Sequence, residues 1–80
     1  MVQARKMSPQ DESLYFKARV ELKINPATEA FAKGIKLSVD RGVVTLEGTV
    51  PSQADSKAAE RVVLTVVGVS GVSNKLTVAG

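Results

Sequence analysis

The sequence contains no cysteine and no histidine among its 80 residues. Their absence excludes disulfides, thiolate and imidazole metal ligands, and nucleophiles that a histidine activates. No serine has a candidate base to activate it, and the acidic residues show no clustered spacing for acid-base or metal chemistry. We therefore expect a protein without enzymatic activity, bound metal or cofactor.

Aromatic residues and long apolar runs are also scarce. Tyr15, Phe16 and Phe31 are the only rings, too few for the stacking platforms of many nucleic-acid binders. The run from Gly68 to Gly71 matches a GxxG loop, but it lacks a basic residue between the glycines. No apolar run approaches the roughly 20 residues that cross a bilayer. We expect neither a nucleic-acid partner nor a transmembrane segment.

The remaining composition is that of a small globular domain with a slight basic excess. Hydrophobic residues make up 44% and charged residues 24% of the chain, and 11 Lys and Arg against 8 Asp and Glu give a net charge of +3. The length fits one domain. This charge permits weak attraction to an anionic surface without requiring it.

The first residues differ from the rest. Residues 1–8 are expected to form a flexible arm before a domain over residues 9–80. The segment from Met1 to Met7 lacks the apolar stretch of about 7 to 15 residues found in signal peptides. Either the protein is cytoplasmic, or the sequence is a mature or excised form whose targeting signal lies elsewhere. We favour the second interpretation because of the resemblance described below.

A helix is predicted from about Pro9 to Ile24. Ser8 is a candidate N-cap before a proline at the first helical position. Residues 25 and 26 are Asn-Pro, which ends the helix because the residue before proline avoids helical angles. The inner face is expected to consist of Leu14, Ala18 and Leu22.

A two-residue period after Ile35 predicts a β-hairpin. Pairing Val39 with Val44 places the apolar residues of both strands on one face and sets Lys36 opposite Glu47. The turn then holds an even number of residues, with Gly42 supplying a positive φ angle.

A second helix begins near Ser52 and is expected to stop near Gly68, with an inner stripe of Ala54, Ala58, Val62 and Val66. The two-residue period returns after Gly71. The predicted fold is a single α+β domain of order αββαβ, with a mixed three-stranded sheet and both helices on one face. The other face is polar, and it carries Lys36, Ser38, Thr45, Glu47, Thr49, Lys75 and Thr77.

Three stretches together resemble the BON domain, a family named for bacterial osmotically induced and nodulation proteins. They span about Asp11 to Val78 and read Asp11-x-x-Leu14-x-x-x-Ala18-x-x-x-Leu22, Ile35-x-Leu37-x-Val39-x-x-Gly42-Val43-Val44-Thr45-Leu46-x-Gly48-x-Val50, and Gly68-Val69-x-x-Val72-x-Asn74-x-Leu76-x-Val78.

The resemblance implies a module of bacterial envelope proteins, periplasmic or associated with the outer membrane, that binds phospholipid surfaces or envelope partners. It brings no catalytic residues. The matching glycines are expected to be structural: Gly42 in the turn, Gly48 where a helix approaches the sheet, and Gly68 at a helix end. Ala18 departs from the family pattern, in which a larger aliphatic residue is common.

A second apolar row on each predicted helix suggests a contact surface. On the first helix, the row lies nearly opposite the inner face. Basic residues around it suit a lipid headgroup boundary or a partner domain. The predicted surface contains Phe16, Val20, Ile24, Val63 and Val67, with Lys17, Arg19, Lys23 and Lys57 around them. Alternatively, the arm or the segment around Phe31 covers the row, or the helices pack through it.

The leading hypothesis is a non-catalytic envelope module that binds a membrane surface or docks to an envelope protein. The alternative is a structural module that oligomerises through an exposed strand edge.

Overall fold

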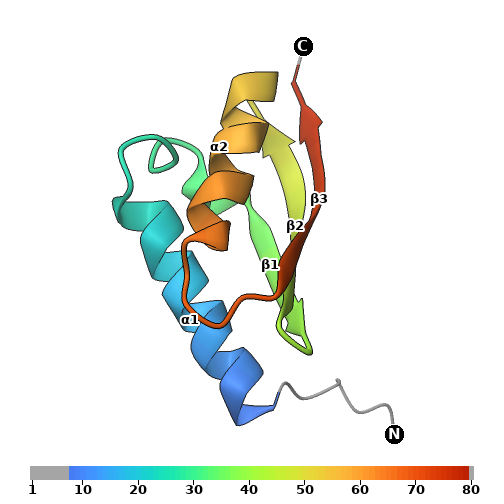
Figure 1. Ribbon diagram of the computed structural model, residues 1–80. Coiled ribbons are helices and arrows are strands. Elements are labelled where there is room, and N and C mark those ends of the chain that lie inside the picture. Colours follow the sequence, from blue (N-terminus) through green and yellow to red (C-terminus); the bar gives the residue numbers. More distant parts are fainter. Residues whose placement is uncertain (1–7, 80) are drawn as a thin grey trace, which may run out of the picture.

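A computed structural model describes residues 8–79, and Met1 to Met7, which form most of the predicted arm, lie outside this range. The elements follow the predicted order αββαβ, with one additional 3-10 turn (Figure 1). They are α1 (Pro9–Ile24), η1 (Ala32–Gly34), β1 (Lys36–Asp40), β2 (Val43–Val50), α2 (Gln53–Leu64) and β3 (Gly71–Val78).

Both helices begin at a serine cap. The Ser8 hydroxyl accepts the Asp11 N–H at 3.1 Å, and the Ser52 hydroxyl accepts the Asp55 N–H at 3.2 Å. Each bond satisfies one of the backbone donors that a helix leaves free in its first turn. The predicted start of α2 near Ser52 is confirmed, and so are both predicted bounds of α1, Pro9 and Ile24.

The end of α2 differs from the prediction. The helix stops at Leu64, and a turn follows in which the Thr65 and Val66 N–H groups bond to the Val62 and Val63 carbonyls. Gly68, expected to end the helix, lies in this turn with a φ of +102°. A Cβ atom there would lie 2.9 Å from a Leu14 methyl group, so Gly68 lets the turn approach α1 closely.

The hairpin has the predicted register. Strands β1 and β2 are antiparallel, with Val39 opposite Val44 and Lys36 opposite Glu47. Arg41 and Gly42 form the turn with φ angles of 53° and 84°. Positive φ at both positions is typical of the turns that match the twist of a tight hairpin.

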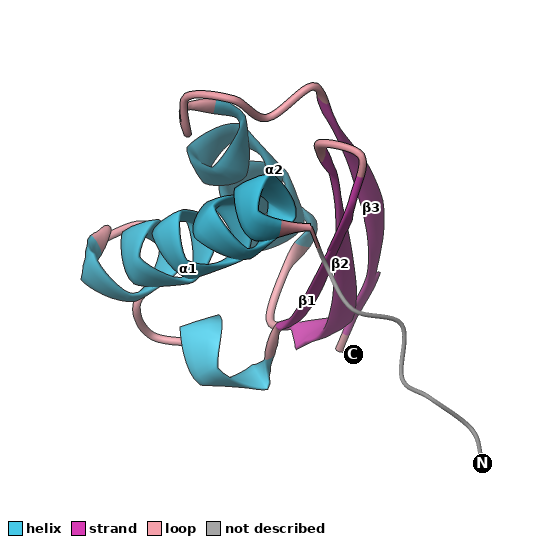
Figure 2. Cartoon of the chain, turned by 90° about the horizontal axis from the view of Figure 1, so that it is seen from below, coloured by secondary structure: helices cyan, strands magenta, loops and turns pink. Residues whose placement is uncertain are grey.

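The sheet is mixed, as predicted. Strand β3 pairs in parallel with β2, and the strand order is β1-β2-β3. Both helices cover the same face of the sheet (Figure 2). On the opposite, polar face, the hydroxyl groups of Thr49 and Thr77 lie 3.1 Å apart and link β2 to β3.

The core lies between the helices and the sheet. Leu14, Ala18 and Leu22 supply the α1 side, while Val44 and Leu46 of β2 are fully buried. Ala18, the departure from the family pattern, is itself fully buried.

The connection after α1 packs over one end of this core. The Thr28 hydroxyl is buried and donates to the Leu22 carbonyl at 2.6 Å, which satisfies an acceptor at the end of α1. Gly48 faces the Gly34 carbonyl so closely that a Cβ atom would lie 2.3 Å from that oxygen. The predicted close approach is therefore present, but the approaching segment is η1 and not a long helix.

Candidate functional site

The outer face of α1 carries an exposed apolar row. Phe16, Val20 and Ile24 are 61%, 52% and 64% exposed, respectively. They follow one another at intervals of four residues, which places them on one side of a helix. The side facing the core is already filled by Leu14, Ala18 and Leu22. Phe31 is half-buried against the core, so it leaves the row open to solvent.

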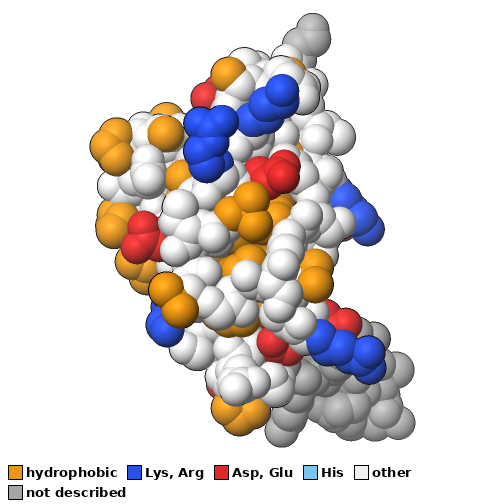
Figure 3. Space-filling view, in the orientation of Figure 1, with side chains coloured by type: hydrophobic (Ala, Val, Ile, Leu, Met, Phe, Trp, Pro, Cys, Tyr) orange, Lys and Arg blue, Asp and Glu red, His pale blue; other side chains and the backbone are white. Residues whose placement is uncertain are grey.

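Basic residues border the row on both sides. At about 100° per residue, Lys17 lies on one side of the row, and Lys23 and Arg19 lie on the other. Lys17 and Lys23 are exposed, and Arg19 is half-buried. In the space-filling view, hydrophobic side chains emerge over the helical layer with Lys and Arg side chains among them (Figure 3).

The turn after α2 extends the apolar surface beyond α1. Val67 is 84% exposed and faces a shallow groove of about 480 Å³. The groove lies between α1 and this turn and is lined by Phe16, Lys17, Val20, Glu21, Thr65, Val66 and Val67. Because α2 ends at Leu64, the turn is free to bring Val67 alongside Phe16 and Val20.

The prediction for Val63 is wrong. Its side chain is fully buried and belongs to the core, so it does not contribute to the outer surface. α2 contacts α1, β2 and β3 together, and it therefore buries a wider arc than a helix with one neighbour. The buried residues of α2 are Ser56, Ala59, Val62 and Val63, whereas Ala54 is exposed and Ala58 is half-buried.

Leu64 is an exposed apolar residue that the sequence pattern did not reveal. It is 49% exposed and lines a small hollow of about 270 Å³ with Lys57, Glu60 and Arg61. The spacing of three between Arg61 and Leu64 was available in the sequence. Leu64 was missed because the first half of the predicted inner stripe of α2, Ala54 and Ala58, does not face the core, whereas Val62 and Val66 do. We call Phe16, Val20, Ile24, Leu64 and Val67 the outer apolar surface.

The family model of the BON domain matches residues 11–80. The chain belongs to the BON domain family. BON domains are non-catalytic modules of the bacterial envelope and its membranes, typically in the periplasm. No curated protein matches this sequence. Neither described helix combines the length and apolar character that a membrane crossing requires.

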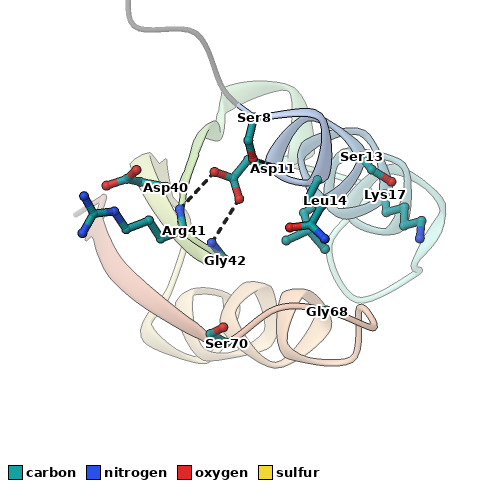
Figure 4. A pocket seen from close by; sticks show the side chains of 11 residues that line it. Ser8, Asp11, Ser13, Leu14, Lys17, Asp40, Arg41, Gly42, Gly68 and Ser70 are labelled. Carbon is teal, nitrogen blue, oxygen red and sulfur yellow. Dashed lines mark hydrogen bonds between the residues drawn. The ribbon is translucent and has the colours of Figure 1, made fainter.

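A second, polar hollow of this BON domain lies at the start of α1. It measures about 700 Å³ and is bordered by α1, the β1–β2 turn and the segment before β3. Asp11 is 8% exposed, and its carboxylate lies between α1 and the turn (Figure 4). One oxygen accepts the Arg41 N–H at 3.0 Å, and the other accepts the Gly42 N–H at 3.1 Å.

This arrangement is structural. The sequence pattern did not reveal this role of Asp11, because its partners lie about thirty residues away. The Gly42 carbonyl in turn accepts the Ser70 N–H at 2.8 Å, so one turn joins three parts of the BON domain. Among residues 8–79, no three acidic side chains gather closely enough to hold a metal ion.

Proposed function

We propose that this BON domain binds anionic phospholipid surfaces peripherally through the outer apolar surface. The observation that carries the proposal is the exposure of Phe16, Val20 and Val67 around one groove. Apolar side chains next to exposed lysines suit the boundary between acyl chains and headgroups. The lysines meet the phosphate groups while the apolar side chains enter the layer beneath them.

The energy available fits weak, reversible binding. Burying a fully exposed valine or phenylalanine side chain contributes about 1.5–3 kcal/mol. Since these side chains are half exposed or more, about 1 kcal/mol each is available on transfer into the interface. A basic residue near an anionic membrane adds about 1 kcal/mol. Phe16, Val20, Ile24 and Val67 are the four side chains of this surface that are more than half exposed. Together with Lys17 and Lys23 they correspond to a dissociation constant on the order of 0.1 mM.

The charge around the groove predicts a preference for anionic lipid that salt weakens. Lys17 borders the groove and Lys23 lies beyond its apolar row, whereas Glu21 also lines the groove and opposes an anionic surface. Attraction between exposed charges is screened within about 10 Å at 0.1 M salt. Binding therefore combines a salt-sensitive part from the lysines with a salt-resistant part from the apolar side chains.

Sedimentation with vesicles tests the proposal. The chain is mixed with vesicles of phosphatidylcholine alone or with phosphatidylglycerol, at two salt concentrations. We expect binding to the anionic vesicles, and weaker binding at the higher salt concentration. In the double variant Phe16→Ser and Val20→Ser, binding is lost while the urea midpoint stays nearly unchanged, because exposed side chains contribute little internal packing.

Matched control variants distinguish an effect of the outer apolar surface from a general effect of removing an apolar or charged side chain. Val43 is 40% exposed on the polar sheet face, so Val43→Ser makes the same kind of change away from the outer apolar surface. Lys17→Gln with Lys23→Gln is compared with Lys36→Gln and Lys75→Gln, which remove the same charge from the polar face. Only the changes on α1 are expected to weaken binding.

Two results would contradict the proposal. Equal vesicle binding by the wild type and the Phe16 and Val20 double variant would exclude this surface. Absence of vesicle binding by the wild type, together with capture of an envelope protein that the double variant loses, would assign the surface to protein docking.

A further inference from the structure

Asn74 connects the outer edge of β3 to α2. Its Nδ2 donates to the Ser56 carbonyl at 3.2 Å, the Ser56 hydroxyl at 3.0 Å and Glu60 Oε1 at 3.1 Å. Its Oδ1 accepts the N–H of Leu76 at 3.0 Å. Both ends of the amide are thus used, one toward the helix and one toward the backbone of its own strand.

The N–H of Leu76 points away from β2, toward the outer edge of the sheet. The Ala79 N–H donates to the Val50 carbonyl of β2 at 2.8 Å. Because successive residues of a strand direct their backbone polar groups to opposite sides, the odd-numbered residues of β3 pair with β2. The even-numbered residues, Asn74 and Leu76 among them, face the outer edge. β3 is an edge strand in the order β1-β2-β3 (Figure 1).

An edge strand of this kind can pair with an additional strand. An incoming strand forms its ladder with the outward N–H and C=O groups, as in β-augmentation. β3 has eight residues and a single charged side chain, Lys75, whereas β1 has five residues with a charge at each end. Its length and low charge make β3 more open than β1 to pairing with another strand. A second copy of the chain offers an identical strand as the partner.

We propose that Asn74 closes the β3 edge to a second copy of the chain. A partner strand needs the Leu76 N–H, and this donor already bonds to an amide that α2 holds in place. Replacing the amide with an apolar side chain frees the Leu76 N–H in the middle of an eight-residue strand, and two copies then pair through β3. This inference concerns a different surface from the proposed lipid contact and does not rest on it.

Hydrogen exchange of the unaltered protein tests directly whether the Asn74 side chain occupies the Leu76 N–H. By the same alternation the Val78 N–H also faces the outer edge of β3, where the strand order β1-β2-β3 places no further strand. We expect the Leu76 amide to exchange at least about tenfold more slowly than the Val78 amide when each is corrected for its intrinsic rate. Equal corrected rates would overturn the proposal, whatever the variants do.

The variant Asn74→Val tests the consequence. We expect its mass by light scattering to rise with concentration toward twice the monomer value, while the wild type stays a monomer. Ser73→Val is the matched control, because it adds the same side chain at a neighbouring position whose backbone faces β2. Adding Val78→Pro to Asn74→Val removes one outward N–H and is expected to restore the monomer.

A monomeric, folded Asn74→Val would overturn the proposal, and so would equal association of Ser73→Val. If Asn74→Val does not fold, the Leu76 exchange rate decides the question by itself. Asn74→Asp adds a second measurement, since it keeps an acceptor for the Leu76 N–H but loses the donor toward Ser56. That variant is expected to remain monomeric.

Discussion

Replacing Asp11 with alanine removes the carboxylate that joins α1 to the β1–β2 turn. Its two oxygens accept the Arg41 and Gly42 N–H groups at 3.0 and 3.1 Å. Arg41 has a φ of 53°, a backbone angle that residues other than glycine rarely adopt. The turn is therefore held in a strained conformation by a contact from a distant helix.

The expected loss follows from these bonds. A hydrogen bond to a charged group contributes about 1.5–3 kcal/mol, and because both bonds are only partly buried we take about 3 kcal/mol for the pair. An acidic residue in the first turn of a helix adds about 0.3–1 kcal/mol. We expect Asp11→Ala to lower the free energy of unfolding by about 3–4 kcal/mol, a large share of the roughly 5–15 kcal/mol of a typical domain.

Urea denaturation followed by circular dichroism measures this loss. With a slope near 1 kcal/mol/M, typical of small domains, the midpoint is expected to fall by about 3 M. Glu12→Ala is the control, because Glu12 is an exposed acid in the same helical turn. A loss for Asp11→Ala no larger than that for Glu12→Ala would refute the structural role of the two hydrogen bonds.

Two further predictions concern the sheet. Leu46 is fully buried, so Leu46→Ala is expected to lower the free energy of unfolding by about 2–5 kcal/mol. Thr45→Ala, on the other face of β2, is expected to lower it much less. Equal urea midpoints for the two variants would show that the hairpin register is wrong. Gly48 has a φ of +131° and faces the Gly34 carbonyl, so Gly48→Ala is expected to cost several kcal/mol in the same assay. Gly71→Ala adds a Cβ atom into open space and is expected to change little, so a comparable loss for both would contradict this reasoning.

The hairpin and α1 were predictable because their signals are local. Val39 pairs with Val44 as the two-residue period requires, since a shift by one residue would turn Thr45 and Glu47 toward the core. The apolar face of α1 follows from a spacing of four residues between Leu14, Ala18 and Leu22. Neither pattern depends on what lies elsewhere in the chain.

The buried face of α2 was not predictable in the same way. The predicted stripe is right for Val62 and Val66, which are buried, and wrong for Ala54 and Ala58. Ser56, Ala59 and Val63 are buried in their place. Small and polar side chains leave the phase of a short helix undetermined. Contact with α1, β2 and β3 at once, together with the amide of Asn74 at Ser56, decided which side faces inward.

The sequence by itself determined the order of the elements, the hairpin register and the apolar row on α1, because each depends on the period of neighbouring residues. Only the tertiary structure decided the roles of Asp11 and Asn74. Asp11 bonds to a turn about thirty residues away, and Asn74 bonds to a helix 14 to 18 residues before it. Such bonds form only when helix and sheet have docked, since the partners are brought together by packing and not by spacing along the chain.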